Sequence, residues 1–392
     1  MRKSKIYELS NNNIYNTSEE YRKEYVRCKK NSFRPLDDRE YRSLKIMYHK
    51  CLPKYYWSNK MQLHISKAYN GAGFTLLNKN YILNNNKKYL LNIYDINSAY
   101  QYTLINDIYV LSNKHKVYNY VFKDITLDKI FKVFKNKKYI CYIEFKGLTP
   151  KYDYVDYNIY QQQLSIKMYK DKITQIGWLC DIDLNNLVKL YNFEYCKIYY
   201  LYHFLEIGKL KVKDFIKEKY EKLHSIANTA ERKNYKTMLH ITTYGKSAQR
   251  TKYEWEKRSK YSIIAIYQSA YVRQRMINIF LKYKKDIAYI DTDSVFIRSN
   301  VKPAFKIGNN IGDFKTEYKQ VKAYINRIKA YILYRNNKRI LYKWSGLQKE
   351  LTEKQVQKIE KGYIIEVKEK REGKEQLFKL YNKYIIGDLI EI

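Results

Sequence analysis

The chain has 392 residues, and its 76 Lys and Arg against 39 Asp and Glu give a formal net charge of +37 at pH 7. This length can hold several subdomains, and the charge favours a polyanionic partner, nucleic acid before an anionic membrane. An AT-rich genome, whose codons favour Lys, Asn, Ile and Tyr, explains part of the same bias, including the 46 Tyr.

Membrane, secreted and zinc-binding classes find no support in the sequence. There is no run of about 18 apolar residues and no apolar leader at the N-terminus. Five scattered cysteines without C-x-x-C spacing fit neither a disulfide framework nor a zinc site. We therefore expect a cytoplasmic protein with reduced thiols and no membrane partner.

The first 95 residues divide into a polar segment and a segment with strand patterns. Residues 1–60 are charge-dense and predict an irregular or helical extension. Asn70-Gly71 and the asparagines at 84–86 separate short apolar runs, as hairpin turns do. Residues 89–94 predict a buried strand that ends at Asp95.

The rest of the chain alternates between strand and helix patterns. Residues 107–205 mix strand-like runs with a helix near 183–191, and residues 211–240 show helical spacing of apolar side chains. A further amphipathic helix covers 266–281 and leads into a strand at 287–290, a turn at 291–294 and a return strand at 295–297. The last 45 residues combine charged helix and strand patterns.

Two acids, Asp291 and Asp293, stand at the tip of the predicted hairpin. At i and i+2 on a strand their side chains point the same way, so they would raise each other's pKa unless a cation lies between them. Mg²⁺ takes one or two carboxylates plus phosphate oxygens, and a pair of such ions suits nucleotidyl transfer. The alternative is a solvated turn, because Asp, Thr and Ser are ordinary turn formers.

Three ordered motifs resemble those of family B DNA polymerases. The segments YDINSAY (94–100), KTMLHITTYGK (236–246) and YIDTDS (289–294) are similar to D-x-x-S-L-Y-P, K-x-x-x-N-S-x-Y-G and Y-x-D-T-D-S. The protein-primed subgroup is most similar, since YNGAGF (69–74) resembles its Y-x-G-G/A segment. IGDFKTE (311–317) and KAY (329–331) resemble its G-x-W/F-x-x-E and K-x-Y segments.

The resemblance implies a catalytic centre of three carboxylates. Asp95 and Asp293, assisted by the Ile96 carbonyl, would hold two Mg²⁺ ions, with Mn²⁺ as an alternative metal. Asp291 would be an accessory catalytic carboxylate. We therefore expect template-directed DNA synthesis from dNTPs on a DNA primer-template.

It also implies a set of dNTP contacts. Tyr100 would lie beneath the sugar and collide with a 2′-hydroxyl, although a buried core tyrosine is the alternative. Lys222 and Lys236 would hold the triphosphate, although a solvated helix face would also carry such lysines. Tyr244 and Gly245 would form the floor under the new base pair, where glycine lets the backbone come close.

DNA contacts are implied for a third set of residues. For Lys329, in so basic a chain, a nonspecific surface charge is the alternative to a primer contact. The residues in this set are Tyr69, Gly71, Ser98, Thr292, Ser294, Lys329 and Tyr331.

Motifs A and B depart from the family pattern. In motif A, Ala99 and Gln101 stand where the family has Leu and Pro, which predicts looser nucleotide selection. In motif B, Tyr244 lies eight positions after Lys236, whereas the family pattern has seven. On a helix, one extra residue rotates the following side chains by about 100° relative to Lys236. Either a one-residue bulge restores the phase and places His240 at the asparagine position, or residues 241–242 take the Asn-Ser positions and Lys236 is displaced.

The resemblance predicts an α+β right-hand polymerase whose palm is a mostly antiparallel sheet with packed helices. The expected parts are an N-terminal extension (1–60), the first part of the palm (61–106), a terminal-protein-region insertion (107–205), the fingers (206–250), the second part of the palm (251–345) and the thumb (346–392).

Spacing between the motifs predicts further properties. Only 94 residues precede Asp95, so we expect no proofreading exonuclease, and the short span between motifs B and C predicts weak processivity and strand displacement. A terminal protein is a possible primer besides an oligonucleotide. We expect a monomer, encoded by a phage or mobile element and located in the cytoplasm of the bacterial host. The competing hypothesis is a catalytically weak relative that binds DNA or a terminal protein.

Overall fold

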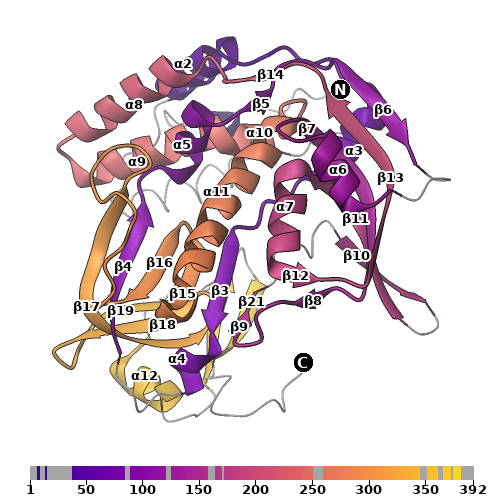
Figure 1. Cartoon of the computed structure of the whole chain (residues 1–392). Helices are drawn as coiled ribbons and strands as arrows, with labels where there is room; N and C mark the ends of the chain where they lie inside the picture. Colours follow the sequence, from indigo (N-terminus) through magenta and orange to yellow (C-terminus); the bar gives the residue numbers. More distant parts are fainter. Residues whose placement is uncertain are drawn as a thin grey trace. The chain divides into compact units, whose positions relative to one another are not determined.

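In the computed structural model, the chain divides into two units (Figure 1). Unit 1 comprises Met1–Gly71, Ser98–Thr149 and Tyr160–Gln274, and unit 2 comprises Ala72–Asn97, Pro150–Ile159 and Arg275–Ile392. The structure describes residues 7–8, 14–15, 38–83, 89–120, 125–157, 164–169, 172–249, 259–344, 351–360, 365–371 and 374–380.

Unit 2 is built on an eight-stranded sheet in the order β19-β18-β17-β4-β16-β15-β3-β9, in which every neighbouring pair is antiparallel. The predicted antiparallel sheet is thus observed, while its assignment as a palm stays a prediction. The strands are β3 (Phe74–Asn78), β4 (Leu90–Ile96), β9 (Val155–Asp156), β15 (Ile287–Thr292), β16 (Ser294–Arg298), β17 (Phe314–Arg327), β18 (Ala330–Arg335) and β19 (Lys338–Trp344).

The strand order corrects one expectation. The asparagine-rich segment at 84–86, which lies outside the described residues, suggested a hairpin between the strands on either side of it. In the sheet, β15 and β16 lie between β3 and β4, so these two strands do not pair. Asn70-Gly71 is not a hairpin turn either, because it joins the helix that ends at Ala68 to β3.

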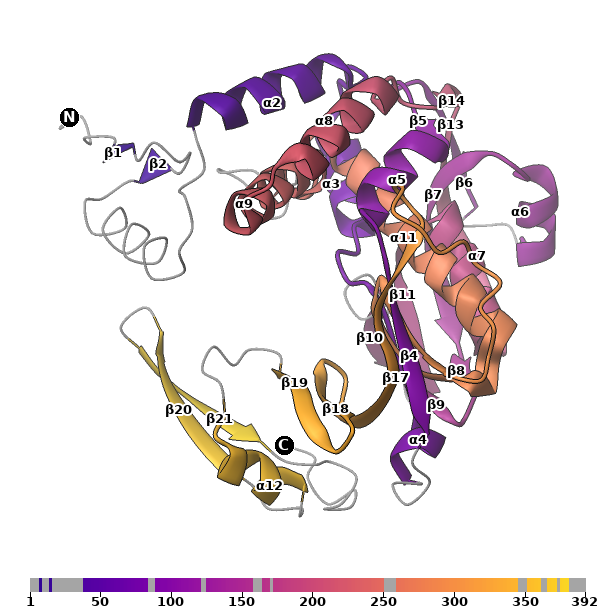
Figure 2. The same ribbon diagram turned by 90° about the vertical axis from the view of Figure 1, so that its left-hand side faces the viewer.

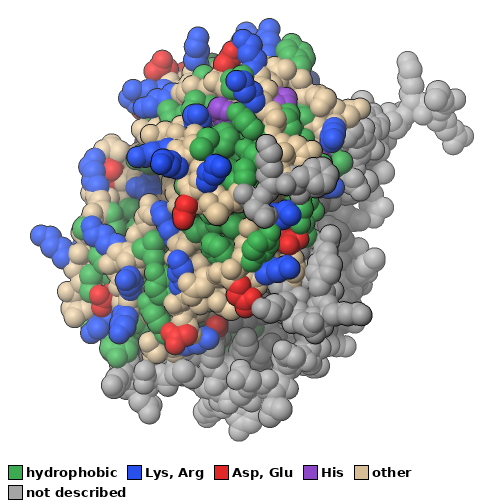
Figure 3. All heavy atoms as spheres, turned by 45° about the vertical axis from the view of Figure 1, so that its right-hand side comes forward, with side chains coloured by type: hydrophobic (Ala, Val, Ile, Leu, Met, Phe, Trp, Pro, Cys, Tyr) green, Lys and Arg blue, Asp and Glu red, His purple; other side chains and the backbone are tan. Residues whose placement is uncertain are grey.

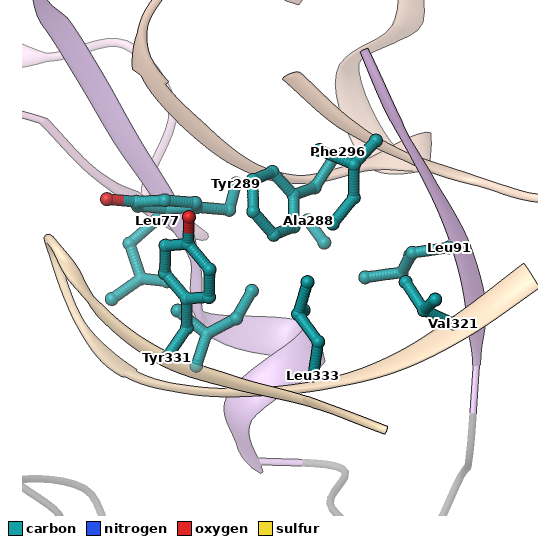
Figure 4. Packing of buried hydrophobic residues seen from close by; sticks show 10 residues of the cluster. Leu77, Leu91, Ala288, Tyr289, Phe296, Val321, Tyr331 and Leu333 are labelled. Atoms are coloured by element: carbon teal, nitrogen blue, oxygen red, sulfur yellow. The ribbon is translucent and has the colours of Figure 1, made fainter. Parts of the chain in front are cut away.

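Bulges in β17 bend the sheet. Its register against β4 shifts between Thr316 and Tyr318 and again between Tyr318 and Val321, and such shifts bend a strand and increase its twist. Figure 2 shows β17, β18 and β19 curving away from β4 into a half-barrel. The concave face holds an apolar cluster drawn in Figure 4, in which Tyr289, Phe296 and Leu333 are buried.

Smaller elements complete unit 2. The helix α12 (Glu353–Glu360) buries Val356 and Ile359 in a cluster with Ile332 and Trp344 of the sheet. The other elements are α4 (Lys79–Leu83), the 3₁₀-helix η2 (Lys284–Asp286) and the hairpin of β20 (Ile365–Arg371) and β21 (Lys374–Leu380). The predicted mixture of helix and strand in the last 45 residues is confirmed for the described part of that segment.

Unit 1 contains a five-stranded antiparallel sheet in the order β10-β11-β7-β13-β6. Helix α3 (Asn59–Ala68) packs on it through His64, which stacks on Trp178 with ring centroids 4.3 Å apart. The strands are β6 (His115–Asn119), β7 (Lys138–Lys146), β10 (Leu164–Tyr169), β11 (Lys172–Cys180) and β13 (Tyr195–Phe204), and the helices beside them are α6 (Leu127–Val133) and α7 (Asp181–Leu190).

A helical part of unit 1 carries motif B. The predicted helix at 211–240 is a pair, α8 (Lys213–Ser225) and α9 (Thr229–His240), because the Asn228 side chain caps α9 by accepting from the amides of Ala230 and Glu231. The remaining elements are α2 (Asp38–Lys50), α5 (Ala99–Asn106), the π-helix η1 (Ile241–Gly245) and α10 (Lys246–Ala248), and the short strands β1 (Tyr7–Glu8), β2 (Ile14–Tyr15), β5 (Tyr109–Val110), β8 (Thr149–Pro150), β12 (Tyr191–Asn192) and β14 (Ile207–Gly208).

The long helix α11 (Ser262–Tyr283) runs from unit 1 into unit 2. In unit 1, its Arg273 forms a fully buried ion pair with Asp183 of α7, with Nη2 and Oδ2 2.6 Å apart. Within the described ranges, no helix is long and apolar enough to cross a bilayer.

Candidate active site

A row of polar side chains crosses five strands of the unit 2 sheet. Thr75 of β3 lies opposite Asp291 of β15, Asp291 opposite Ser294 of β16, Ser294 opposite Asp95 of β4, and Asp95 opposite Lys315 of β17. Residues directly opposite each other on antiparallel strands share a face of the sheet. Two acids about 200 positions apart in the sequence therefore lie on one face, separated by one serine.

The hairpin turn between β15 and β16 brings the third acid to the end of β4. The Asp293 amide donates to the Asp291 carbonyl at 2.7 Å, and the Ile96 amide donates to the Asp293 carbonyl at 3.0 Å. The second bond holds the Asp293 main chain against the residue that follows Asp95. The predicted meeting of the strand end with the hairpin tip is thus observed.

The middle residue of this turn has an unusual conformation. Thr292 has a φ of 64°, and a β-branched residue at positive φ is an outlier. Together with the hydrogen bond from Asp293 to Asp291, this φ matches the rare classic γ-turn. Such outliers persist only where the surrounding structure holds them in place, and they cluster at functional sites.

Asp291 is surrounded by positive charge. Its side chain is only 7% exposed, and its carboxylate lies 3.2 Å from Lys329 Nζ and 3.8 Å from Lys343 Nζ. A buried carboxylate needs such partners to remain ionised. The oxygens of Asp291 thus already face two cations of the chain, and its role as an accessory carboxylate stays a prediction.

The K-x-Y segment contacts the same row. The Lys329 amide donates to the Tyr289 hydroxyl at 2.7 Å, and the Tyr331 ring packs edge-on against Phe296 with centroids 5.1 Å apart. Burial raises the pKa of Tyr331 above its usual value, and the charges of Asp291 and Asp95 raise it further. Lys329 therefore lies beside Asp291, and the Tyr331 ring lies where the charges of both acids act on it.

The donor set suits a hard cation only in part. In the portion of the chain that the structure describes, no group of three or more His, Cys, Asp and Glu side chains could hold a metal ion. Asp95, Asp293 and the Ile96 carbonyl are oxygen donors of the kind that Mg²⁺ prefers, and Mg²⁺ commonly binds through one or two carboxylates with substrate phosphates and water as its other ligands. The residues fit a substrate-assisted Mg²⁺ site rather than a cage made by the protein alone.

A second group of predicted residues lies within unit 1. The hydroxyls of Tyr69 and Tyr244 are 2.6 Å apart, and the rings of Tyr100 and Tyr244 have centroids 4.5 Å apart. His240 completes the group, with its ring 5.5 Å from those of both Tyr100 and Tyr244. Tyr100 is half-buried, and its role in excluding a 2′-hydroxyl stays a prediction.

The extra residue of motif B is taken up by a π-helix. The turn Ile241–Gly245 is π-helical, which inserts one residue into a helix and restores its phase, often at functional sites. Thr242 and Thr243 are buried, whereas His240 is exposed and lies beside Tyr100. The bulge alternative is therefore the one observed, and the asparagine position of His240 stays a prediction.

The remaining predicted residues lie at the surface of unit 1. Lys222 and Lys236 are exposed on the neighbouring helices α8 and α9. Ser98 has a φ of 50° and precedes α5 without capping it. A Cβ at Gly245 would meet only Ile241, at 3.7 Å, whereas one at Gly71 would meet the Tyr69 hydroxyl at 2.7 Å. The packing of the chain itself thus does not require Gly245, which agrees with a close approach by a ligand.

The sequence analysis did not single out two residues that lie near the Asp291–Asp293 turn of unit 2. Lys343 lies on β19, and no local pattern in so basic a chain distinguishes it from other lysines. Gly73 is the second glycine of the YNGAGF segment. A glycine there can indicate a close approach by another part of the chain, but the sequence does not show that the approaching residue is Thr292.

Positive charge is not confined to one patch. Figure 3 shows Lys and Arg side chains scattered over one face, with Asp and Glu side chains between them. This distribution favours contact with phosphates along a surface rather than at one point.

No protein-family model matches the chain, and no curated protein matches it. Solved structures, in contrast, match the chain. A ternary complex of phi29 DNA polymerase with primer-template DNA and incoming nucleotide substrates aligns with a TM-score of 0.61 at 17% identity, over 93% of this chain and 72% of that one. The chain has the fold of phi29 DNA polymerase.

Two more structures of that polymerase agree. Its binary complex with primer-template DNA gives a TM-score of 0.61 at 17% identity, over 94% of this chain and 73% of that one. Its complex with single-stranded DNA gives 0.62 at 16% identity, over 94% and 74%. The similarity confirms a mixed fold of helices and antiparallel sheet like that of phi29 DNA polymerase. The division into palm, fingers and thumb, the subdomain bounds and the roles of individual residues stay predictions.

Proposed function

We propose that the chain is a DNA-directed DNA polymerase that transfers nucleotidyl groups from dNTPs to a primer 3′-hydroxyl. One observation carries this proposal. Asp95 and the Asp291–Asp293 turn, far apart in the sequence, lie side by side on one sheet face in a chain with the phi29 polymerase fold. A polyanionic partner also suits the net charge of +37.

The acids would assemble the reacting groups. Asp95, Asp293 and the Ile96 carbonyl would hold Mg²⁺, which when bound supplies charge neutralisation and a lower pKa for the attacking hydroxyl. Asp291 would keep Lys329 and Lys343 in place beside these groups. The two lysines and Tyr331 would then hold the primer strand close to Asp95, through phosphate contacts.

The residues of unit 1 would select and hold the nucleotide. Tyr100 would exclude a 2′-hydroxyl by collision, and Tyr244 with Gly245 would support the new base pair. Lys222 and Lys236 would stabilise charge on the triphosphate as the α-phosphate is attacked. Tyr69, Gly71, Ser98, Thr292 and Ser294 would contact the template-primer.

We further propose protein-primed replication of a phage or mobile element inside a bacterial host, with the chain acting as a monomer and residues 107–205 contacting a terminal protein. Omitting the terminal protein from a replication reaction on the natural linear template would abolish initiation but leave extension of a DNA primer unchanged. The absence of proofreading stays a prediction, which trimming of a 3′-mismatched primer would contradict.

Primer extension tests the proposal directly. The purified chain with a primed template, dNTPs and Mg²⁺ should extend the primer, and Asp293→Asn should slow extension by about 100-fold or more while primer-template binding, measured by anisotropy, is retained. Asp286→Asn is a matched control, because Asp286 lies in the same unit and its carboxylate is 3.7 Å from Arg298 at the surface. Equal extension by wild type and Asp293→Asn would overturn the catalytic assignment.

A DNA-binding or terminal-protein-binding module is the second candidate. The close pairing of Asp291 with two lysines and the histidine in motif B favour it. Retained DNA binding without extension in either Mg²⁺ or Mn²⁺ would establish this function instead.

A further inference from the structure

Gly73, just before β3, lies against the turn of the candidate active site. Its neighbour Phe74 lies opposite Thr292 in the sheet. A Cβ on Gly73 would lie 2.5 Å from Thr292 Oγ1, 2.6 Å from Cγ2 and 2.8 Å from Cβ. All three distances are shorter than van der Waals contact, so the Thr292 side chain occupies the space that any other residue at position 73 would need.

Thr292 has little freedom to move aside. Its short, β-branched side chain is stiff, and one of the three close atoms is its own Cβ, which cannot move without the backbone. That backbone is in the left-handed region, with a φ of 64°. On one side Asp291 is buried and paired with lysines, and on the other the Asp293 carbonyl accepts from Ile96.

We propose that Gly73 is a positioning residue for the catalytic turn: its missing side chain leaves the space in which Thr292 sits, and thereby sets the placement of Asp291 and Asp293. This inference rests on the proposed polymerase function for its effect on rate. Gly73 has no side chain of its own, so it would act on the turn through the space it leaves for Thr292.

The contrast with other glycines supports this assignment. At Gly208, an added Cβ would meet the end of the Leu111 side chain at 2.9 Å, a flexible group that can rotate away. At Gly73 the added methyl would meet a rigid side chain in a turn that carries two acids. The same substitution is therefore expected to be tolerated at one site and to displace the turn at the other.

A mutant cycle tests the inference. Gly73→Ala should slow primer extension by about 10- to 100-fold, the range for a misplacement of up to about 1 Å, with the Kd for primer-template and the urea midpoint close to wild type. Thr292→Gly removes all three close atoms. In that background, adding Gly73→Ala should change the rate by no more than about twofold, and Gly208→Ala should behave as wild type.

Hydrogen exchange gives a readout independent of activity. The Asp293 amide, which donates to Asp291 within the turn, should exchange faster in Gly73→Ala and no faster in the double variant than in Thr292→Gly alone. An inactive wild type would refute the proposed function but leave this measurement decisive. Unchanged exchange and rate in Gly73→Ala, or an equal loss in both backgrounds, would overturn the positioning role.

Discussion

The buried ion pair of unit 1 permits a quantitative prediction. The Arg273 guanidinium donates to both carboxylate oxygens of Asp183, from Nε at 2.9 Å and from Nη2 at 2.6 Å, and neither side chain is exposed to solvent. Its Nη1 donates to the Asn70 carbonyl at 2.9 Å. The pair therefore ties α7 and α11 to the segment that contains Tyr69 and Gly71.

Asp183→Ala would remove the carboxylate that pairs with Arg273 and leave the guanidinium charge buried. Removal of one partner from a buried pair costs about 3–5 kcal/mol, a large share of the roughly 5–15 kcal/mol of a typical domain. Replacing both partners by apolar residues, as in Asp183→Leu with Arg273→Met, removes the charge as well as its partner. We therefore expect the double variant to be more stable than Asp183→Ala.

Urea unfolding at pH 7, followed by circular dichroism, measures these free energies of unfolding. Lys114→Ala is the matched control in the same unit, because Lys114 and Glu206 form a pair of similar length, 2.6 Å, with side chains 70% and 44% exposed. We expect no resolvable change in this control. If Asp183→Ala lowered the stability no more than Lys114→Ala does, or if the double variant were the least stable, the argument from burial would be refuted.

Three further changes test other parts of the chain. Burial, and then the charges of Lys60 and Lys67, lowers the pKa of His64 from 6.5 to about 4. The unfolded chain thus binds this proton more tightly, so the free energy of unfolding should fall as the pH drops from 6.5 to about 4, and the urea midpoint of His64→Gln should fall less over the same range. Tyr100→Val should raise ribonucleotide incorporation relative to dNTPs by about tenfold or more in single-nucleotide extension, because the colliding ring is removed; an unchanged ratio would refute the steric role. Lys343→Gln should weaken primer-template binding and reduce the slope of log K against log salt by about one; an unchanged slope would show that Lys343 makes no phosphate contact.

The sequence predicted the elements of the candidate site better than their neighbours. The apolar runs before Asp95 and Asp291 are strong strand signals, and the observed strands continue one residue past each acid, to Ile96 and to Thr292. Strand order is a long-range property, however, and short turns between consecutive strands are only the commonest solution. The hairpin expected around residues 84–86 was wrong because the distant strands β15 and β16 insert between β3 and β4.

Motif B shows the opposite case, in which counting residues was informative. One extra residue in a helix rotates every later side chain by about 100°, so either the helix or the motif had to change. The helix changed, at Ile241–Gly245. No such arithmetic exists for Lys343, whose approach to Asp291 depends on how β17 bends and carries β18 and β19 over the sheet.

The curled sheet explains why two acids occur in a run that is otherwise suited to burial. Along β15 and β16 the side chains of Tyr289, Asp291, Ser294 and Phe296 share one face, so the acid row is the continuation of the apolar cluster beneath the half-barrel. A charge at the end of an apolar face must be solvated or paired. Here the same curl that covers the cluster brings Lys329 and Lys343 to Asp291. One structural feature thus buries the core, neutralises one acid and leaves Asp95 and Asp293 partly exposed beside it.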